Sequence, residues 1–102
     1  MILAELSRPL ALLRMLAADH PKLPAVDVQV SPITPDLLRL AAHHDLGAFE
    51  TWREALGIDP NTIERHVRDD GRIVTLVAET VIADARVELT SYSQNLTIVK
   101  AA

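Results

Sequence analysis

The sequence contains no cysteine, three glycines and only 3% aromatic residues. The absence of cysteine excludes a thiolate nucleophile, a disulfide framework and a cysteine-ligated zinc site. The glycines lie apart at Gly47, Gly57 and Gly71, so they cannot form a loop that cradles phosphate groups. We therefore expect no bound cofactor.

Long apolar runs are missing as well. A membrane-spanning helix needs about 20 apolar residues, whereas the longest runs here, such as residues 10–13, are only a few residues long. A secretory signal begins with basic residues, but Glu5 precedes every Lys and Arg in this chain. We expect a cytoplasmic protein with no membrane partner.

Acidic residues outnumber basic ones, with 14 Asp and Glu against 10 Lys and Arg, which gives a formal net charge of −4. The densest basic stretch, residues 64–72, holds three arginines and three acidic residues, so their fields nearly cancel. Proteins that bind nucleic acid non-specifically need clustered positive charge. We expect no nucleic-acid partner.

The length of 102 residues and the hydrophobic fraction of 49% fit one domain with its own core. We place this domain at residues 1–93. The periodic pattern ends there, so residues 94–102 are expected to form a C-terminal tail, although residues 96–99 could pair with an exposed strand edge.

Two segments have the periodicity of helices. Apolar residues three and four positions apart predict a helix over residues 8–18, with Ser7 as its N-cap and residues 1–6 frayed or in a separate turn. The expected apolar stripe consists of Leu3, Leu6, Leu10, Leu13, Leu16 and Ala17. A second helix is expected between Asp45 as N-cap and Gly57 as C-cap.

Alternation of apolar and polar residues predicts strands over residues 25–31, 62–68, 72–82 and 85–92. The dipeptide Asp70-Gly71 is typical of a tight hairpin turn, and Ala83-Asp84 is a weaker signal of the same kind. Residues 34–43 fit two structures. Thr34-Pro35-Asp36 is typical of a helix start, whereas residues 37–43 alternate like a strand, and the residue pattern alone leaves both open.

One resemblance bears on this segment. The run from His43 to Gly57, HHDLGAFETWREALG, together with HPKLP at residues 20–24, resembles a group of small uncharacterised α+β proteins of high-GC bacteria. The resemblance implies a strand over residues 37–43. It covers most of the chain, but its motifs are packing motifs and imply no activity, ligand or functional residue.

The predicted fold class is α+β, with the order α-β-β-α-β-β-β and an antiparallel sheet of about five strands that has both helices on one face. If residues 37–43 were helical, the order would become α-β-α-α-β-β-β.

Histidines are the main candidates for chemistry. His43, His44 and Asp45 are adjacent, but neighbouring residues point to different faces, so the two imidazoles cannot easily share a metal ion or a proton. No familiar ligand spacing links them to His20 or His66. A serine-histidine-aspartate triad lacks a nucleophile elbow. We assign no catalytic or metal-binding residue.

The strand over residues 72–82 is apolar on both faces. Its inward set would be Val74, Leu76, Ala78, Thr80 and Ile82. The opposite face carries Ile73, Val77 and Val81, to which a strand over residues 37–43 would add Leu37 and Ala41, with Tyr92 at the margin. Something should cover this second face: the first helix, the C-terminal tail or a second copy of the chain.

Two functions follow from these patterns. The first is a non-catalytic interaction module that forms a homodimer or binds another protein through Ile73, Val77, Val81 and Tyr92. The second is a small-molecule binder or modest enzyme with a pocket between sheet and helices, whose polar groups would be His43, His44 and His66.

Overall fold

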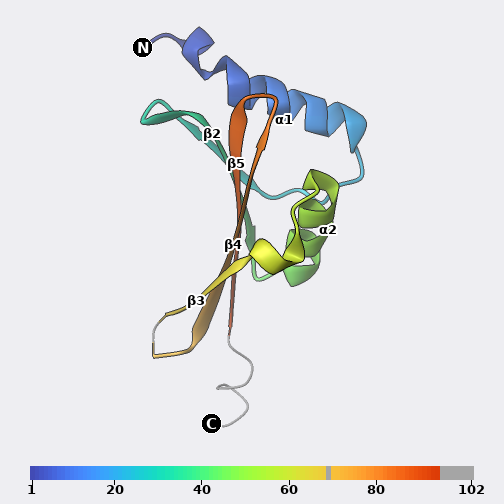
Figure 1. The fold of residues 1–102 in the computed structure, drawn as a ribbon, viewed down its shortest axis with the longest axis vertical. Coiled ribbons are helices and arrows are strands. Elements are labelled where there is room, and N and C mark those ends of the chain that lie inside the picture. The colour runs from blue at the N-terminus through green and yellow to red at the C-terminus, as the bar shows by residue number, and fades with distance from the viewer. Residues whose placement is uncertain (69, 95–102) are drawn as a thin grey trace.

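A computed structural model describes residues 1–68 and 70–94. It has the predicted α+β class and the predicted order α-β-β-α-β-β-β (Figure 1). The elements in chain order are the 3-10 helix η1 (Leu3–Leu6), α1 (Ser7–Asp19), β1 (Asp27–Ser31), β2 (Thr34–His43), α2 (Leu46–Leu56), the 3-10 helix η2 (Pro60–Thr62), β3 (Glu64–Arg68), β4 (Ile73–Ile82) and β5 (Ala85–Gln94).

The five strands form one sheet in the order β1-β2-β5-β4-β3. Three pairings are antiparallel, but β2 and β5 run parallel, with Leu40 beside Leu89. The expectation of a purely antiparallel sheet was therefore wrong in this detail. The chain passes from β2 through α2 and two further strands before it returns as β5, and alternation within a strand does not specify the direction of its neighbour.

β2 resolves the segment that the residue pattern left open. Residues 34–43 form a strand, so the helix start suggested by Thr34-Pro35-Asp36 is wrong. Every second side chain of β2 faces the helices, and Leu38 and Leu40 are both fully buried. Pairing with β1 on one side and β5 on the other satisfies its backbone, which favours the strand over local helix signals.

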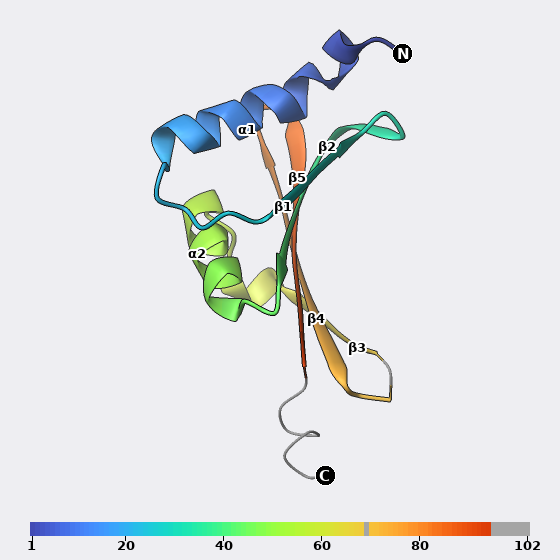
Figure 2. The same ribbon diagram turned by 180° about the vertical axis from the view of Figure 1, so that it is seen from behind.

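The core lies between one face of the sheet and the two helices, which lie on the same side of the strands (Figures 1 and 2). Even-numbered residues of β2 and odd-numbered residues of β5 enter this core. Phe49 and Trp52 of α2 are both buried there, as expected from their spacing on the helix. Leu12 and Leu16 contribute from α1.

α1 buries a stripe that matches the predicted one only in part, since Leu16 is buried and Leu13 packs against the core as expected. Pro9, Leu12 and Leu16 are its buried residues, whereas Leu3 is 74% and Leu10 38% exposed. Leucine or methionine occurs nearly all round this helix, so periodicity alone cannot select the face that meets the core. The 3-10 turn before Ser7 also breaks the helical phase between Leu3 and α1.

The caps of α2 and the turn between β4 and β5 agree with the sequence, whereas the prediction of Ser7 as the N-cap of the first helix was wrong, because Leu6 occupies that position without a side-chain hydrogen bond. Asp45 Oδ1 accepts a hydrogen bond from the amide of Ala48 at 2.9 Å, and Gly57 ends α2 with φ of 71°. Ala83 and Asp84 both have positive φ, so they form a two-residue turn of type I′ character between β4 and β5.

β5 includes Gln94. The remaining part of the predicted tail, with its possible strand pairing at residues 96–99, lies outside the described residues. Within the described ranges, none of the helices has the length and apolar character that a bilayer crossing requires.

Candidate functional site

The sheet has a second face that neither α1 nor α2 covers, seen most clearly from behind (Figure 2). We call this surface the open face. It carries the odd-numbered residues of β2 and β4 and the even-numbered residues of β5, because the alternate residues of these strands enter the core. All four residues predicted to bind a partner, Ile73, Val77, Val81 and Tyr92, point to this face.

Three apolar side chains, Ile73, Val77 and Val81, lie along β4 on the open face, with Thr75 and Glu79 at the positions between them; we call these three the β4 column. Ile73 and Val77 are half-buried, and Val81 is 65% exposed. The strand register places Val81 beside Arg86, which in turn lies beside Leu37 of β2. The residues that sequence patterning expected on one surface are thus adjacent in space.

A row that includes three ring-bearing side chains crosses the same face. The register aligns His43, Tyr92, Thr75 and His66 on four successive strands. The imidazole of His43 stacks on the ring of Tyr92, with centroids 5.4 Å apart and planes 14° from parallel. His43 Nε2 also lies 2.7 Å from Asp27 Oδ2 of β1, so a carboxylate and an aromatic ring both position this imidazole.

The histidines do not line a space between sheet and helices. His43 and His66 lie on the open face, and His66 Nε2 is 3.2 Å from Glu64 Oε2. His44 lies in the turn after β2 with φ of 54°, and its amide donates to the carbonyl of Tyr92 at 2.7 Å. The structure therefore separates His44 from the other two.

A hollow of about 310 Å³ crosses β1, β2 and β5 on the open face. It exists because the short side chains of Ala41 and Thr90 lie side by side between two taller rows. One row is the His43–Tyr92 stack. The other is the ion pair between Arg39 Nε and Glu88 Oε1, at 3.7 Å. We call this hollow the cross-strand slot.

A second hollow of about 290 Å³ lies beside the slot and is lined by Leu37, Glu79, Val81, Arg86 and Glu88, among others. Glu79 and Glu88 are direct cross-strand neighbours, an arrangement that costs free energy unless cations are near. Arg86 supplies one, and its Nε also donates to Asp36 Oδ2 at 2.9 Å. That hydrogen bond lowers the pKa of Asp36 and raises the pKa of Arg86.

The structure does not assemble the other chemical arrangements that the sequence allowed. Ser91 is buried on the helix side of β5, away from His66 on the open face, and Asp45 caps α2. Across residues 1–68 and 70–94, no three His, Asp or Glu side chains lie close enough together to hold a metal ion.

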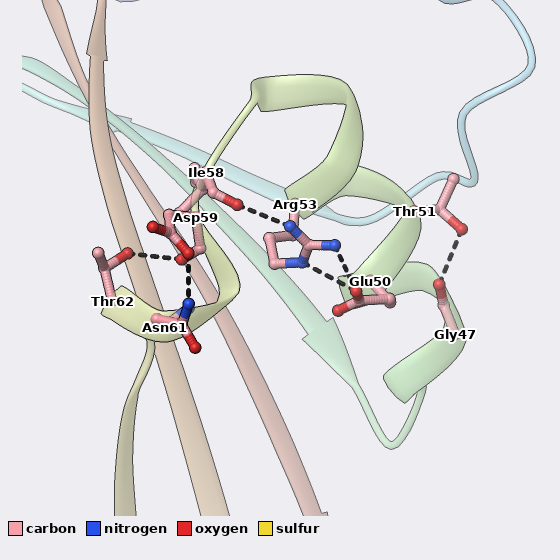
Figure 3. Close-up of polar contacts among 8 residues, drawn as sticks. All are labelled: Gly47, Glu50, Thr51, Arg53, Ile58, Asp59, Asn61 and Thr62. Carbon is pink, nitrogen blue, oxygen red and sulfur yellow. Dashed lines mark hydrogen bonds and ion pairs between the residues drawn. The ribbon is translucent and has the colours of Figure 1, made fainter.

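A separate polar cluster joins the end of α2 to the turn before β3 (Figure 3). Arg53 donates from Nε to Glu50 at 2.9 Å and from Nη1 to the carbonyl of Ile58 at 2.6 Å. Hydrogen bonding between the two side chains lowers the pKa of Glu50 and raises that of Arg53. Asp59 accepts from the amide of Asn61 at 2.9 Å. These internal contacts hold the connection between α2 and β3.

Sequence reasoning missed one apolar surface. The outer side of η1 and α1 borders an open hollow of about 690 Å³, lined mainly by Leu3, Leu10, Ala11 and Met15. The available signal was the surplus of leucine and methionine around the helix, which exceeds what one buried stripe needs.

In comparisons with known proteins, no family model, curated protein or solved structure matched the chain. The resemblance to small α+β proteins of high-GC bacteria therefore stays a prediction.

Proposed function

We propose that the protein is a small non-catalytic interaction module that forms a homodimer through the β4 side of its open face. The observation that carries this proposal is Val81, which is 65% exposed in line with Val77 and Ile73 on a face that neither helix covers. Apolar side chains in such a column lose contact with water when a partner covers them.

A second copy is the occupant we favour. α1 packs on the opposite face of the sheet, so it is not the element that covers β4. A two-fold contact places the same patch of each chain against the other, which needs no second protein with a complementary surface. The β4 side of the open face also carries both signs of charge, with Arg86 beside Val81 and Glu79 on β4 itself, so two copies can be placed with opposite charges facing.

The size of the patch predicts a reversible dimer. β4 is about 33 Å long and a strip three strands wide spans about 14 Å, so each copy would bury roughly 450 Å². The total of roughly 900 Å² is below that of a standard stable interface and matches transient ones. We therefore expect monomer and dimer to exchange as the concentration changes.

Sedimentation velocity from about 1 µM to about 1 mM protein tests this proposal, and the weight-average mass should rise from monomer toward dimer. Val81→Asp should weaken association by about tenfold or more, because a carboxylate would be buried at the contact. Ile33→Asp is the matched control. Ile33 is 91% exposed in the turn between β1 and β2, and its replacement should leave association unchanged.

Two results would overturn the proposal. One is a monomer mass over the whole concentration range. The other is a dimer that survives Val81→Asp but dissociates on Leu10→Asp, since this would place the contact on the outer side of α1 instead. If the protein stays a monomer but binds a different protein, and Val81→Asp abolishes that binding, the surface would serve a partner other than a second copy.

A further inference from the structure

We propose that the cross-strand slot binds a free basic amino acid, a molecule in which two ammonium groups and one carboxylate are joined by a short methylene chain. The proposal rests on the shape of the slot, on the signs of the charges around it and on their spacing in the strand register. It goes beyond the homodimer, because the slot is centred on β2 and its neighbours β1 and β5, and its β5 residues border the strip around β4.

The shape of the slot suits a small ligand with an apolar middle. Its floor is the methyl group of Ala41 and the side chain of Thr90, and its volume is about 310 Å³. Ligand pockets run from about 300 to 1,000 Å³, so this hollow lies at the small end of the range. A chain of four methylenes can lie on this floor between the two taller rows.

The charges around the slot define the ligand. Two carboxylates, Asp27 and Glu88, one guanidinium, Arg39, and the imidazole of His43, which contacts Asp27, line it. A molecule with two positive groups and one negative group has the complementary set of charges. Asp27 already accepts from His43, but a carboxylate has further lone pairs for an ammonium group. Arg39 Nε is 3.7 Å from Glu88 Oε1, longer than a hydrogen bond, so the guanidinium can donate hydrogen bonds to the carboxylate of a ligand.

The spacing fits the same molecule. Asp27 of β1 lies beside Ala41 of β2. Glu88 lies on β5, two strands away from β1 and two residues along from Thr90, the partner of Ala41. The Cα atoms of Asp27 and Glu88 are therefore about 12 Å apart by strand spacing and rise. The Asp27 carboxylate contacts His43, in the row on the far side of the floor from Glu88. The two nitrogens of extended lysine are about 7 Å apart by ordinary bond lengths, so an extended lysine can lie between Asp27 and Glu88.

The ligand would therefore lie diagonally across the sheet. Its side-chain ammonium group meets Asp27, its methylenes cover Ala41 and Thr90, and its α-ammonium and α-carboxylate groups meet Glu88 and Arg39. Arg39 and Glu88 lie side by side, so the guanidinium can bind the α-carboxylate while the carboxylate binds the adjacent α-ammonium group.

The test is a titration of ¹⁵N-labelled protein with L-lysine at low ionic strength, followed by amide chemical shifts. Saturable shifts are expected at the amides of residues 27–29, 39–43 and 88–92. Ala41→Leu fills the floor without changing charge and should abolish the shifts. Ala18→Leu is its matched control, since Ala18 is exposed on α1, and this variant should bind as the parent does.

Charge variants separate the two ends of the ligand. Glu88→Gln should weaken binding by about tenfold, whereas Glu79→Gln removes the cross-strand neighbour of Glu88, outside the slot lining, and should have little effect. Arg39→Gln should remove the preference for L-lysine over 1,5-diaminopentane, because these two probes differ in the carboxylate that Arg39 would bind.

The proposal is overturned if L-lysine causes no saturable shift, if Ala41→Leu binds as well as the parent, or if 1,5-diaminopentane and L-lysine bind equally to the parent protein. Repeating the titration with Val81→Asp separates this proposal from the homodimer. Unchanged binding in that variant supports a slot that is complete within one chain, and loss of binding overturns that assignment.

Discussion

Trp52 of α2 donates its indole N–H to the carbonyl oxygen of Pro24 at 2.7 Å. The bond fixes α2 to the segment that leads into β1, and the Trp52 ring is buried in the core. Trp52→Phe keeps an aromatic ring but removes the donor and part of the volume. It should lower the free energy of unfolding by about 1–3 kcal/mol, measured by urea denaturation with circular dichroism. A change within about 0.5 kcal/mol would mean that this contact adds little to stability.

Two buried hydroxyl groups have no hydrogen-bond partner among the described residues, Thr75 Oγ1 and Ser91 Oγ. Burial of an unpaired hydroxyl costs free energy. Thr75→Val keeps the shape and should raise the free energy of unfolding by up to about 1 kcal/mol. Thr90→Val is the matched control, because Thr90 Oγ1 contacts the carbonyl of Leu40 at 3.4 Å. If Thr75→Val proves the less stable of the two variants, the explanation fails.

The turn between β4 and β5 uses residues that are poor for its geometry. Ala83 and Asp84 have φ of 50° and 63°, and a side chain such as alanine is strained in this region. The double replacement Ala83→Asn and Asp84→Gly supplies the pair that type I′ turns prefer. It should raise the free energy of unfolding by about 1 kcal/mol, seen as a higher thermal midpoint. No gain would show that the neighbouring strands already impose the turn.

The ion pair of Asp36 and Arg86 predicts a pH dependence of stability. The pKa of Asp36 is lowered below its usual value of 3.8, mainly by the hydrogen bond from Arg86. A lowered pKa in the folded state means that the pair stabilises the fold above the unfolded pKa and loses this effect as the pH falls through the folded pKa.

Asp36→Asn should therefore be less stable than the parent near neutral pH, and the difference should vanish when the pH is lowered well below 3.8. Thermal unfolding as a function of pH measures it. Arg86→Gln should show the same profile, and a difference that persists in acid would contradict this explanation. The side chains are exposed, so the effect should be small and should decrease with added salt.

Local patterns predicted much of this fold because local forces determine those parts. Asp45 and Gly57 marked the ends of α2, whereas the pattern in residues 34–43 left strand and helix open, and pairing with β1 and β5 determines the strand that forms there. The parallel pairing of β2 with β5 could not be predicted in this way, since it depends on which strands meet after α2 has crossed the sheet.

The candidate site shows the same limit. Sequence patterning identified the apolar column of Ile73, Val77 and Val81, because these residues lie on one strand. The cross-strand slot could not be predicted, because its floor consists of Ala41 and Thr90. These residues are far apart in the sequence and become neighbours only through the pairing of β2 with β5. The outer apolar side of α1 was missed because leucine surrounds the helix and periodicity does not select a face.

The parallel seam also determines when the protein can fold during synthesis. β5 lies in the middle of the sheet but is made after the other four strands. Leu40 pairs with Leu89, which is synthesised 49 residues later, so the β1–β2 hairpin leaves the ribosome with one edge of β2 unpaired. Folding should then be limited by closure of this long loop.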